Sequence, residues 1–441
     1  MSKIFTVSIL GCGSRGHYTY GKCMYEFKDK FKLACVCDND PEKIRLAQEA
    51  WGIAEKDCFL DSDEFLKEKR SDALVIATQD RDHVRMCVKA LELGYDILLE
   101  KPISPVEDEL YELLKANEKY RRKVIVCHVL RYAPAFLKIK SLLDSGEIGK
   151  IVCIDWIEQV TYWHQAHSFV RGNWRNDKET SPMIMQKCCH DLDLLQYYAN
   201  SKCKTVYSVG ELSFFHKGNK PEGASSRCAD CKYKHDCAYS AERLYVEKWK
   251  KDFDWAFDKP DVNDYERKQG WPFNVVDLTR PITEESIRKA YENSNYGQCV
   301  FDCDNNVVDN QTVVMQFENG VKANLTMTAF TALPGRKMTF HGTLGEIEMD
   351  EENGYIRVSR YGHGTRFLKI KEILKEIMND DFGHGGGDFM LVQDFYKALS
   401  GDVELGTTLD RSIESHLMAL AAEKSRVTGQ VCHLHKDKNE Q

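Results

Sequence analysis

The fold is decided by the stretch Phe5-Thr6-Val7-Ser8-Ile9-Leu10-Gly11-Cys12-Gly13-Ser14-Arg15-Gly16. An apolar-rich run that ends in glycines is typical of a strand entering a tight turn, and the spacing G-x-G-x-x-G then leads into a helical pattern. The first glycine allows the turn, the second lets backbone approach a pyrophosphate, and the third packs helix on strand. Free N–H groups and the helix dipole would hold the phosphates. In isolation the same spacing also fits an ordinary turn. The neighbouring elements therefore decide between an ordinary turn and a phosphate-binding turn.

The first 125 residues alternate short strand-like runs with helical patterns. We expect strands at residues 5–10, 32–37, 73–78, 96–99 and 123–127. Residues 82–93 carry apolar side chains at helical spacing and stop at Gly94, as an amphipathic helix does. Such alternation predicts a parallel sheet with crossover helices, so we interpret residues 1–127 as a dinucleotide-binding α/β domain.

The pattern changes after residue 127. Strands are expected at 152–160, 312–317, 321–329, 345–349 and 355–358, with Asn319-Gly320 and Asn353-Gly354 as tight turns. Strands joined by short turns are antiparallel, so residues 128–441 are predicted to form an α+β domain with a largely antiparallel open sheet. Helices are expected at 191–198, 389–399 and 412–427. The aromatic and charged stretch 214–295 is interpreted as an insertion.

Composition excludes several classes of protein. The chain has 441 residues, 61 Lys plus Arg against 69 Asp plus Glu, and a net charge of −8. Without a basic tract it is not expected to bind nucleic acid or an anionic membrane, and it has no apolar run of the length that spans a bilayer. Seventeen cysteines, mostly single among apolar residues, favour a reducing cytoplasm. We expect a small-molecule partner.

Two short segments carry the first chemical signals. Asp38 follows the second predicted strand, where an acid accepts hydrogen bonds from ribose hydroxyls and repels a 2′-phosphate, which favours NAD over NADP. Its alternative role is a loop acid before a helix. Glu100-Lys101-Pro102 ends another strand, at the sheet edge where ligands bind. Lys101 could bind a substrate hydroxyl and take its proton, although an exposed surface lysine is the alternative.

Several segments together resemble the Gfo/Idh/MocA oxidoreductases in order and spacing. They are the glycine motif 11–16, residues 75–78 with His83, Glu100-Lys101-Pro102, and residues 131–134, 187–193 and 421–426 with Gly429. The resemblance implies a Rossmann domain, a second domain whose open sheet carries the substrate, and a homodimer or homotetramer. It also implies NAD as cofactor and a sugar or cyclitol as substrate. The implied cofactor-binding residues are Gly11, Gly13, Ser14, Arg15, Gly16, Asp38, Thr78, His83, Glu100 and Lys101.

The same resemblance points to catalytic residues. By position, Lys101 and His190 match the family lysine and histidine, whereas Gln186 stands where the family often has Asp. Because an amide exchanges no proton near neutral pH, acid–base work falls on Lys101, His190 or Lys187. Asp193, one helical turn after His190, is expected to orient its imidazole. The charges of this segment also fit a solvated ion-pair cluster.

Two further segments could line a substrate pocket. Residues 163–175 combine aromatic faces with planar donors, which suits sugar rings, although a packed loop explains them equally. The predicted substrate-binding residues are Arg131, Tyr132, His167, Arg171, Trp174, Gln186 and Asp193. The glycine-rich residues 383–387 are expected to form a turn before a helix that Asp388 caps, with a ligand-touching loop through His384 as the alternative.

The insertion carries a separate signal. Cys228, Cys231 and Cys237 have the spacing C-x2-C-x5-C, and Cys299 or Cys303 could supply a fourth thiolate. Tetrahedral zinc accepts such a set, and four thiolates would make the site structural. An iron–sulfur cluster and unliganded thiols are the alternatives.

Three functions are compatible with these features. The first is NAD-dependent oxidation of a secondary hydroxyl of a sugar, sugar derivative or cyclitol. The second is glycoside cleavage with tightly held NAD through a transient 3-keto intermediate. The third is a non-catalytic sensor that keeps the dinucleotide fold, motivated by Gln186.

Overall fold

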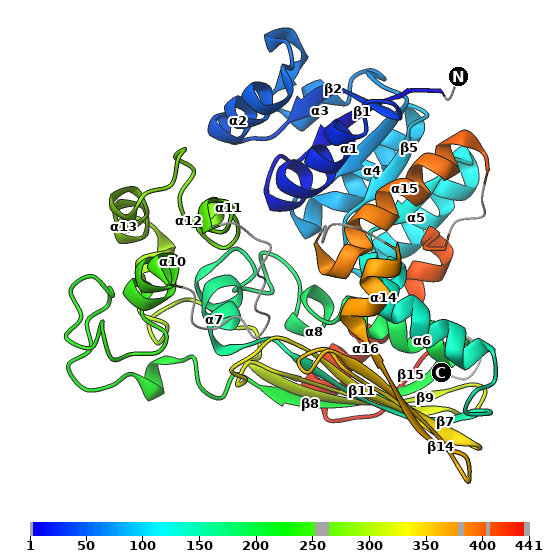
Figure 1. Cartoon of the computed structure of the whole chain (residues 1–441). Coiled ribbons are helices and arrows are strands. Elements are labelled where there is room, and N and C mark those ends of the chain that lie inside the picture. The colour runs from blue at the N-terminus through cyan, green and yellow to red at the C-terminus, as the bar shows by residue number, and fades with distance from the viewer. Residues whose placement is uncertain (1–2, 252–263, 378–382, 403–405, 436–441) are drawn as a thin grey trace.

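The computed structural model describes residues 3–251, 264–377, 383–402 and 406–435 and contains two sheets (Figure 1). The first sheet is parallel, with the order β3-β2-β1-β4-β5-β6. Its strands are β1 (Phe5–Leu10), β2 (Phe31–Cys37), β3 (Cys58–Phe59), β4 (Ala73–Ile76), β5 (Asp96–Leu99) and β6 (Val124–Val126). The predicted Rossmann sheet is therefore confirmed, with strand ends shifted by one or two residues.

Helices bury both faces of this sheet. Along β4, Ala73 and Val75 belong to one apolar core, whereas Leu74 and Ile76 belong to another. Side chains of α1 (Lys22–Glu26) and α2 (Pro41–Trp51) lie in the first core, and those of α4 (His83–Glu92) and α5 (Glu107–Tyr120) in the second. A strand buried on both faces needs a continuous apolar run, as β4 has.

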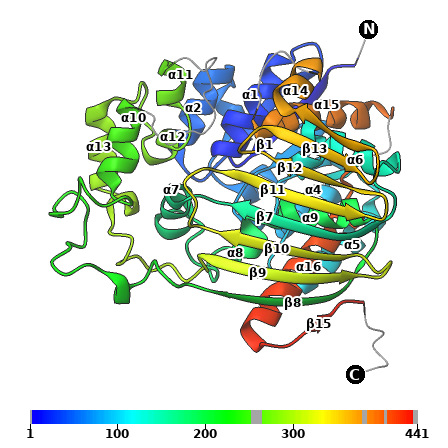
Figure 2. The same ribbon diagram turned by 60° about the horizontal axis from the view of Figure 1, so that its bottom comes forward.

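The second sheet has the order β14-β13-β12-β11-β7-β10-β9-β8-β15 (Figure 2). Its strands are β7 (Ile151–Gln159), β8 (Cys203–Glu211), β9 (Asn310–Phe317), β10 (Lys322–Thr328), β11 (Gly335–Gly342), β12 (Gly345–Asp350), β13 (Tyr355–Arg360), β14 (Gly364–Lys369) and β15 (Cys432–His433). Its described strand pairs are antiparallel except β7 with β10, which confirms the predicted sheet class. Gly320 adopts φ +90° in the expected turn.

The last two long helices return to the first domain. α15 (Gly387–Ser400) and α16 (Leu409–Thr428) follow the second sheet in the chain, yet both pack against Rossmann elements (Figure 1). The Val126 N–H donates to the Thr407 carbonyl oxygen at 3.0 Å, and Lys123 Nζ bonds the Ala398 carbonyl oxygen. The C-terminal segment therefore closes the junction between the two sheets.

Residues 214–295, which we call the insertion, lie between β8 and β9 and hold helices without a named strand in their described part. They are η7 (Glu242–Glu247), α10 (Lys248–Lys250), α11 (Asp264–Gln269), α12 (Phe273–Val276) and α13 (Glu284–Glu292). Buried Tyr245, Phe273 and Tyr291 form a core of their own with Trp163 of α7 (Tyr162–His164). In both ribbon views α11 lies near α2, whereas α13 lies on the outer side of the insertion (Figures 1 and 2).

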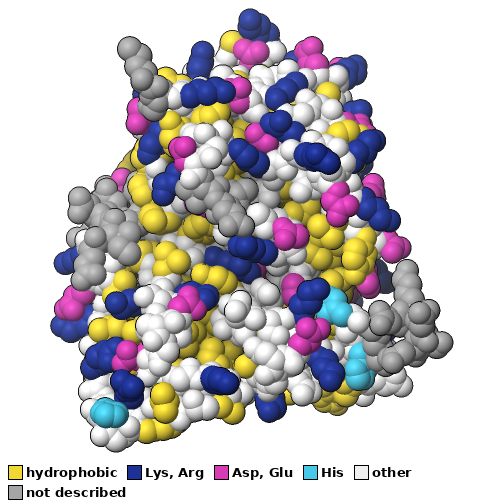
Figure 3. Space-filling model, turned by 90° about the vertical axis from the view of Figure 1, so that its right-hand side faces the viewer, with side chains coloured by type: hydrophobic (Ala, Val, Ile, Leu, Met, Phe, Trp, Pro, Cys, Tyr) yellow, Lys and Arg dark blue, Asp and Glu magenta, His cyan; other side chains and the backbone are white. Residues whose placement is uncertain are grey.

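On the face shown in Figure 3, basic and acidic side chains are interspersed. In the described part of the chain, each helix is too short or too polar to cross a bilayer.

Candidate functional site

The glycine turn leaves room for a ligand at one position only. Gly11 has φ +94°, and a Cβ atom there would lie 2.4 Å from the Ala77 carbonyl oxygen. A Cβ atom on Gly16 would lie 1.8 Å from the Gly11 carbonyl oxygen, so both glycines are required by packing. A Cβ atom on Gly13 would meet no protein atom within 4 Å. Gly13 therefore borders open space at the start of η1 (Ser14–Gly21), where a pyrophosphate fits.

Asp38 is fixed at the end of β2 beside this turn. Its Oδ2 accepts from the Cys12 N–H at 2.7 Å and its Oδ1 from the Asp40 N–H at 2.9 Å. Lys43 Nζ lies 3.6 Å from Oδ1. These contacts hold the carboxylate next to the glycine turn, which fits the ribose-binding position predicted for it.

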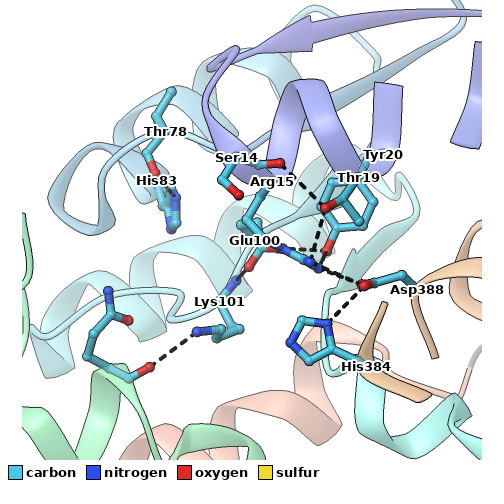
Figure 4. A network of polar contacts seen from close by, with 11 residues as sticks. Ser14, Arg15, Thr19, Tyr20, Thr78, His83, Glu100, Lys101, His384 and Asp388 are labelled. Carbon is cyan, nitrogen blue, oxygen red and sulfur yellow. Dashed lines mark hydrogen bonds and ion pairs between the residues drawn. The ribbon is translucent and has the colours of Figure 1, made fainter. Parts of the chain in front are cut away.

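A buried polar network joins the glycine motif to the start of α15 (Figure 4). Arg15 donates from Nε to Glu100 Oε1 at 2.6 Å and from Nη2 to Asp388 Oδ1 at 2.7 Å. The Tyr20 hydroxyl donates to the same Glu100 oxygen at 2.6 Å. Burial alone would raise the pKa of Glu100, but Arg15 and Lys101 outweigh it and the pKa is lowered. The side chains of Arg15 and Glu100 are thus engaged with protein partners, and the cofactor-binding role predicted for them stays a prediction.

Lys101 stands directly after β5 and points from this network toward the second domain (Figure 4). Its N–H donates to Glu100 Oε2 at 2.9 Å, and its Nζ donates to the Gln186 carbonyl oxygen at 3.2 Å. No carboxylate of the described residues forms an ion pair with Nζ. The ammonium is therefore held by one carbonyl and keeps donors for a ligand.

His190 lies next to Lys101 at the start of α9 (Cys189–Ala199). Burial, followed by the charges of Lys101, His128 and His384, holds the pKa of the imidazole well below its usual range. Its Nδ1 has no hydrogen-bond partner among the described residues, and its ring centroid is 6.1 Å from that of His384. The sequence places Lys101 and His190 far apart, and the fold brings a lysine and a neutral imidazole together.

Lys187 and Asp191 belong to an ion network on the second sheet. Lys187 Nζ lies 2.9 Å from Glu158 Oε1, and Arg336 Nη2 lies 2.9 Å from the other oxygen of Glu158. Arg336 Nε donates to Asp191 Oδ1 at 2.7 Å, which also accepts from Trp156 Nε1 at 2.8 Å. Lys187 is thus paired with Glu158, and the catalytic role predicted for this lysine stays a prediction.

The expected pairing of Asp193 with His190 is wrong. Both oxygens of Asp193 accept from Arg131, at 2.6 and 2.7 Å, and this pair is buried. Tyr132 Oη lies 3.1 Å from both Asp394 Oδ2 and Thr407 Oγ1. Arg131, Tyr132 and Asp193 therefore join α9 to the C-terminal segment, and the substrate-binding role expected of them stays a prediction.

The aromatic segment faces the insertion. His167 is 2% exposed and bonds the Tyr245 hydroxyl at 3.0 Å, and Arg171 is 1% exposed and bonds the carbonyl oxygens of Gln298 and Tyr239. Trp174 packs beside Phe169 against the main core. The packed-loop alternative thus describes His167 and Arg171, which hold the insertion in place.

Three site residues carried too weak a signal in the sequence. Buried Asp80 accepts from Ser181 Oγ at 2.7 Å and lies 3.4 Å from Gln186 Nε2, so a carboxylate reaches Gln186 from the loop after β4. The pKa of His164 is held well below its usual range by burial and then by Lys187, His167 and Lys101, which places it near the two lysines.

The third of these residues, His384, which the sequence offered only through the ligand-touching alternative, bonds Asp388 Oδ2 at 2.8 Å. Asp388 pairs with Arg15 and does not cap α15, whose N-cap is Gly386 without a side-chain bond, so that expectation is wrong.

His83 lies with Nδ1 2.7 Å from the Pro102 carbonyl oxygen and Nε2 3.1 Å from that of Thr78. It thereby ties the loop after β4 to the Lys101 segment.

The predicted zinc site is not supported. Cys228, Cys231, Cys237 and Cys299 line one cavity, but among the described residues no group of three or more His, Cys, Asp or Glu side chains is placed to hold a metal. Arg171 Nη2 instead donates to Cys228 Sγ at 3.5 Å, so a buried guanidinium stands among the thiols. All 17 cysteines are free.

The fold and site define a dinucleotide-binding oxidoreductase with a separate open-sheet domain. Family models agree: an oxidoreductase family, NAD-binding Rossmann fold, matches residues 5–128, and the C-terminal alpha/beta domain of the same family matches residues 140–434. The chain belongs to the Gfo/Idh/MocA oxidoreductase family and is an NAD-dependent oxidoreductase.

Individual relatives give the same family. The chain is 23% identical over 404 residues to a Bacillus subtilis (strain 168) protein named as an oxidoreductase, YteT, covering 88% of each chain. It is 34% identical over 210 residues to scyllo-inositol 2-dehydrogenase (NAD(+)) of the same organism, covering 46% of this chain and 57% of that one.

A solved structure shares the whole fold. The oxidoreductase domain protein from Kribbella flavida has a TM-score of 0.69 at 16% identity, covering 99% of this chain and 100% of that one. At this identity the likeness shows the fold alone.

Proposed function

We propose that the protein oxidises a secondary hydroxyl of a sugar, sugar derivative or cyclitol by hydride transfer. The observation that carries this is that Lys101 Nζ donates to the Gln186 carbonyl oxygen of the second domain, with the lysine close enough for its charge to lower the pKa of buried His190. Support for the substrate class comes from relatives named as inositol dehydrogenases. None of the relatives described above is a glycoside-cleaving enzyme, so that alternative has no support.

In this proposal each residue has a separate task. Bound NAD would supply the hydride acceptor. With its amine unprotonated, Lys101 would accept the proton of the substrate hydroxyl and become an ammonium while the hydride leaves the same carbon for the cofactor, so charge and atoms balance. His190, kept neutral by burial, offers one ring nitrogen as acceptor and one as donor and orients the hydroxyl. Gly13 and Asp38 hold the pyrophosphate and ribose.

A panel of sugars and cyclitols tests this function. Purified protein is mixed with NAD and each compound, and NADH formation is followed by absorbance. At least one compound should give NADH in proportion to substrate consumed, and His190→Ala should lower that rate. If no compound across a broad panel yields NADH above the no-enzyme control, the proposed function is wrong.

We also propose that the protein forms a homodimer or homotetramer through the outer face of the second sheet. Val314, Val152 and Ile157 on this face are 50%, 46% and 41% exposed, which is unusual for apolar strand residues. A cytoplasmic location is proposed as well, supported by 17 cysteines that are all unpaired. Light scattering on the purified protein would measure the subunit number, and a monomer would contradict the proposal.

A further inference from the structure

One loop of the insertion reaches across to the dinucleotide-binding domain. Arg280, between α12 and α13, donates from Nη2 to the Tyr18 hydroxyl at 2.5 Å, with its guanidinium carbon 5.7 Å from the Tyr18 ring centroid. Tyr18 lies on η1, the helix that begins at the glycine motif. In Figure 1 the loop between α12 and α13 extends toward α2. Sequence patterns gave no reason to connect the insertion with the cofactor.

The loop that carries Arg280 is fixed from within the insertion. Asp277, 2% exposed, accepts from the Thr279 N–H and hydroxyl at 2.8 and 2.7 Å and from Ser286 Oγ at 2.5 Å. The Gln269 amide pairs with both the N–H and the carbonyl oxygen of Ile282, at 2.6 and 3.0 Å. A rigid loop places a charged side chain at low entropic cost, because little freedom remains to be lost on binding.

Arg280 forms no ion pair with a described carboxylate, although its charge also acts on Glu42 of α2, whose pKa is lowered mainly by Arg45 and to a lesser degree by Arg280. Its guanidinium bonds the carbonyl oxygens of Asp277 and Thr279 and the Tyr18 hydroxyl, all uncharged. Its field reaches the glycine motif: burial, and then Arg280, lower the pKa of His17 to about 4. His17 is the residue directly after Gly16. A cation beside a phosphate-binding turn is suited to an anion.

We propose that Arg280 is a cofactor-binding residue, supplied by the insertion, that donates to the pyrophosphate of the dinucleotide. The guanidinium is a better match for this task than an ammonium, because its planar donors pair with two phosphate oxygens at once. The insertion then acts as a fixed clasp over the cofactor. The inference rests on the proposed function only in requiring that the chain bind NAD.

Binding measurements on the whole protein test this directly. The variants are Arg280→Ala, Arg280→Gln and, as a matched loss of one charge on the same insertion, Lys289→Ala, whose side chain is exposed. Each is titrated by calorimetry with NAD, ADP-ribose, adenosine and NADP. We expect both Arg280 variants to bind NAD and ADP-ribose about tenfold or more weakly, as loss of a charged hydrogen bond does, and to bind adenosine as the wild type does. Lys289→Ala should bind all four like the wild type.

The other outcomes are separable. If the wild type binds no NAD, the proposed function fails before the variants are compared. If the wild type binds NAD and Arg280→Gln retains its affinity for NAD and ADP-ribose, the inference is overturned. An equal loss for adenosine would assign Arg280 to the base or ribose, and a loss confined to NADP would assign it to a 2′-phosphate; either result also overturns the pyrophosphate assignment. Thermal unfolding of each apo variant verifies that it is folded.

Discussion

The guanidinium of Arg15 and the carboxylate of Asp388 pair at 2.7 Å, although 373 positions of sequence separate them. Arg15 belongs to the glycine motif and Asp388 to the first turn of α15, which follows the whole second sheet. Asp388 also holds His384, whose ring faces that of His190. One buried ion pair therefore connects the phosphate-binding turn, the C-terminal helices and the candidate catalytic histidine.

Removing this pair should destabilise the fold. Asp388→Asn leaves Arg15 with the carboxylate of Glu100 alone and His384 without its carboxylate, and breaking a buried pair costs up to about 3–5 kcal/mol. The pKa of Asp388 lies below its usual range because Arg15 and then His384 outweigh the effect of burial. Its stabilisation is complete above the unfolded pKa of about 3.9 and is lost as the pH falls below that value. Urea unfolding at pH 7 and pH 3 should show a smaller difference between variant and wild type at the lower pH, because at pH 3 the unfolded carboxyl is largely protonated while the folded one is still ionised. An equal difference at both would contradict the assignment.

The glycine turn gives a contrast between two variants. Gly13→Ala adds a methyl group where no protein atom lies within 4 Å, at φ −76°, so the fold should keep its stability within about 1 kcal/mol. The same methyl group fills the space meant for the pyrophosphate, so NAD affinity should fall at least about tenfold. Gly11→Ala, at φ +94° and against the Ala77 carbonyl oxygen, should instead destabilise by several kcal/mol. Calorimetric titration with NAD and urea unfolding measure both; a Gly13→Ala protein with wild-type affinity would exclude the proposed cradle.

His416 makes stability depend on pH. Its Nε2 accepts from the Ile103 N–H at 2.8 Å and its Nδ1 lies 2.9 Å from the Ser412 carbonyl oxygen, a pattern that only a neutral ring satisfies. Burial, with His128 adding to it, lowers the pKa of His416 to about 3. Since the unfolded residue titrates at about 6.5, acid favours the unfolded chain, and the cost reaches about 1.4 kcal/mol by pH 5.5.

His416→Gln keeps an acceptor without a titrating group, so it should remove that share of the acid sensitivity. The comparison is the change in unfolding free energy between pH 7.5 and pH 5.5 in each protein, which cancels any constant loss from the substitution. A variant that is as acid-sensitive as the wild type would show that His416 is not held neutral.

Local patterns were sufficient for most of the fold. The apolar runs of β1, β4 and β5 and the turn at Gly320 depend on neighbouring residues, and all were predicted within a residue or two. The return of α15 and α16 to the first domain was not predicted. An amphipathic pattern shows which face of a helix is buried, but not which element of the fold covers that face. Asp388 illustrates this: a helix-start acid predicts a cap, whereas its actual partner is Arg15.

The residues of the candidate site also divide into those that local sequence patterns predicted and those that long-range packing determines. Gly13, Asp38 and Lys101 are fixed by strand ends, which the sequence reveals, and they lie where expected. Arg131 and Asp193 were assigned by composition and position to the substrate, yet they pair with each other. A carboxylate matches any nearby cation, so spacing along the chain could not distinguish His190 from Arg131. Asp80 reaches the site from the loop after β4 and had no motif of its own.

The most direct measurement of the central claim compares Lys101→Met with the wild type on a compound that the wild type oxidises. The account predicts that kcat/KM for NADH formation falls by about 10²–10⁴, the usual contribution of a proton-transferring side chain, while the Kd for NAD stays within about twofold. A Lys101→Met protein that forms NADH at close to the wild-type rate would contradict it.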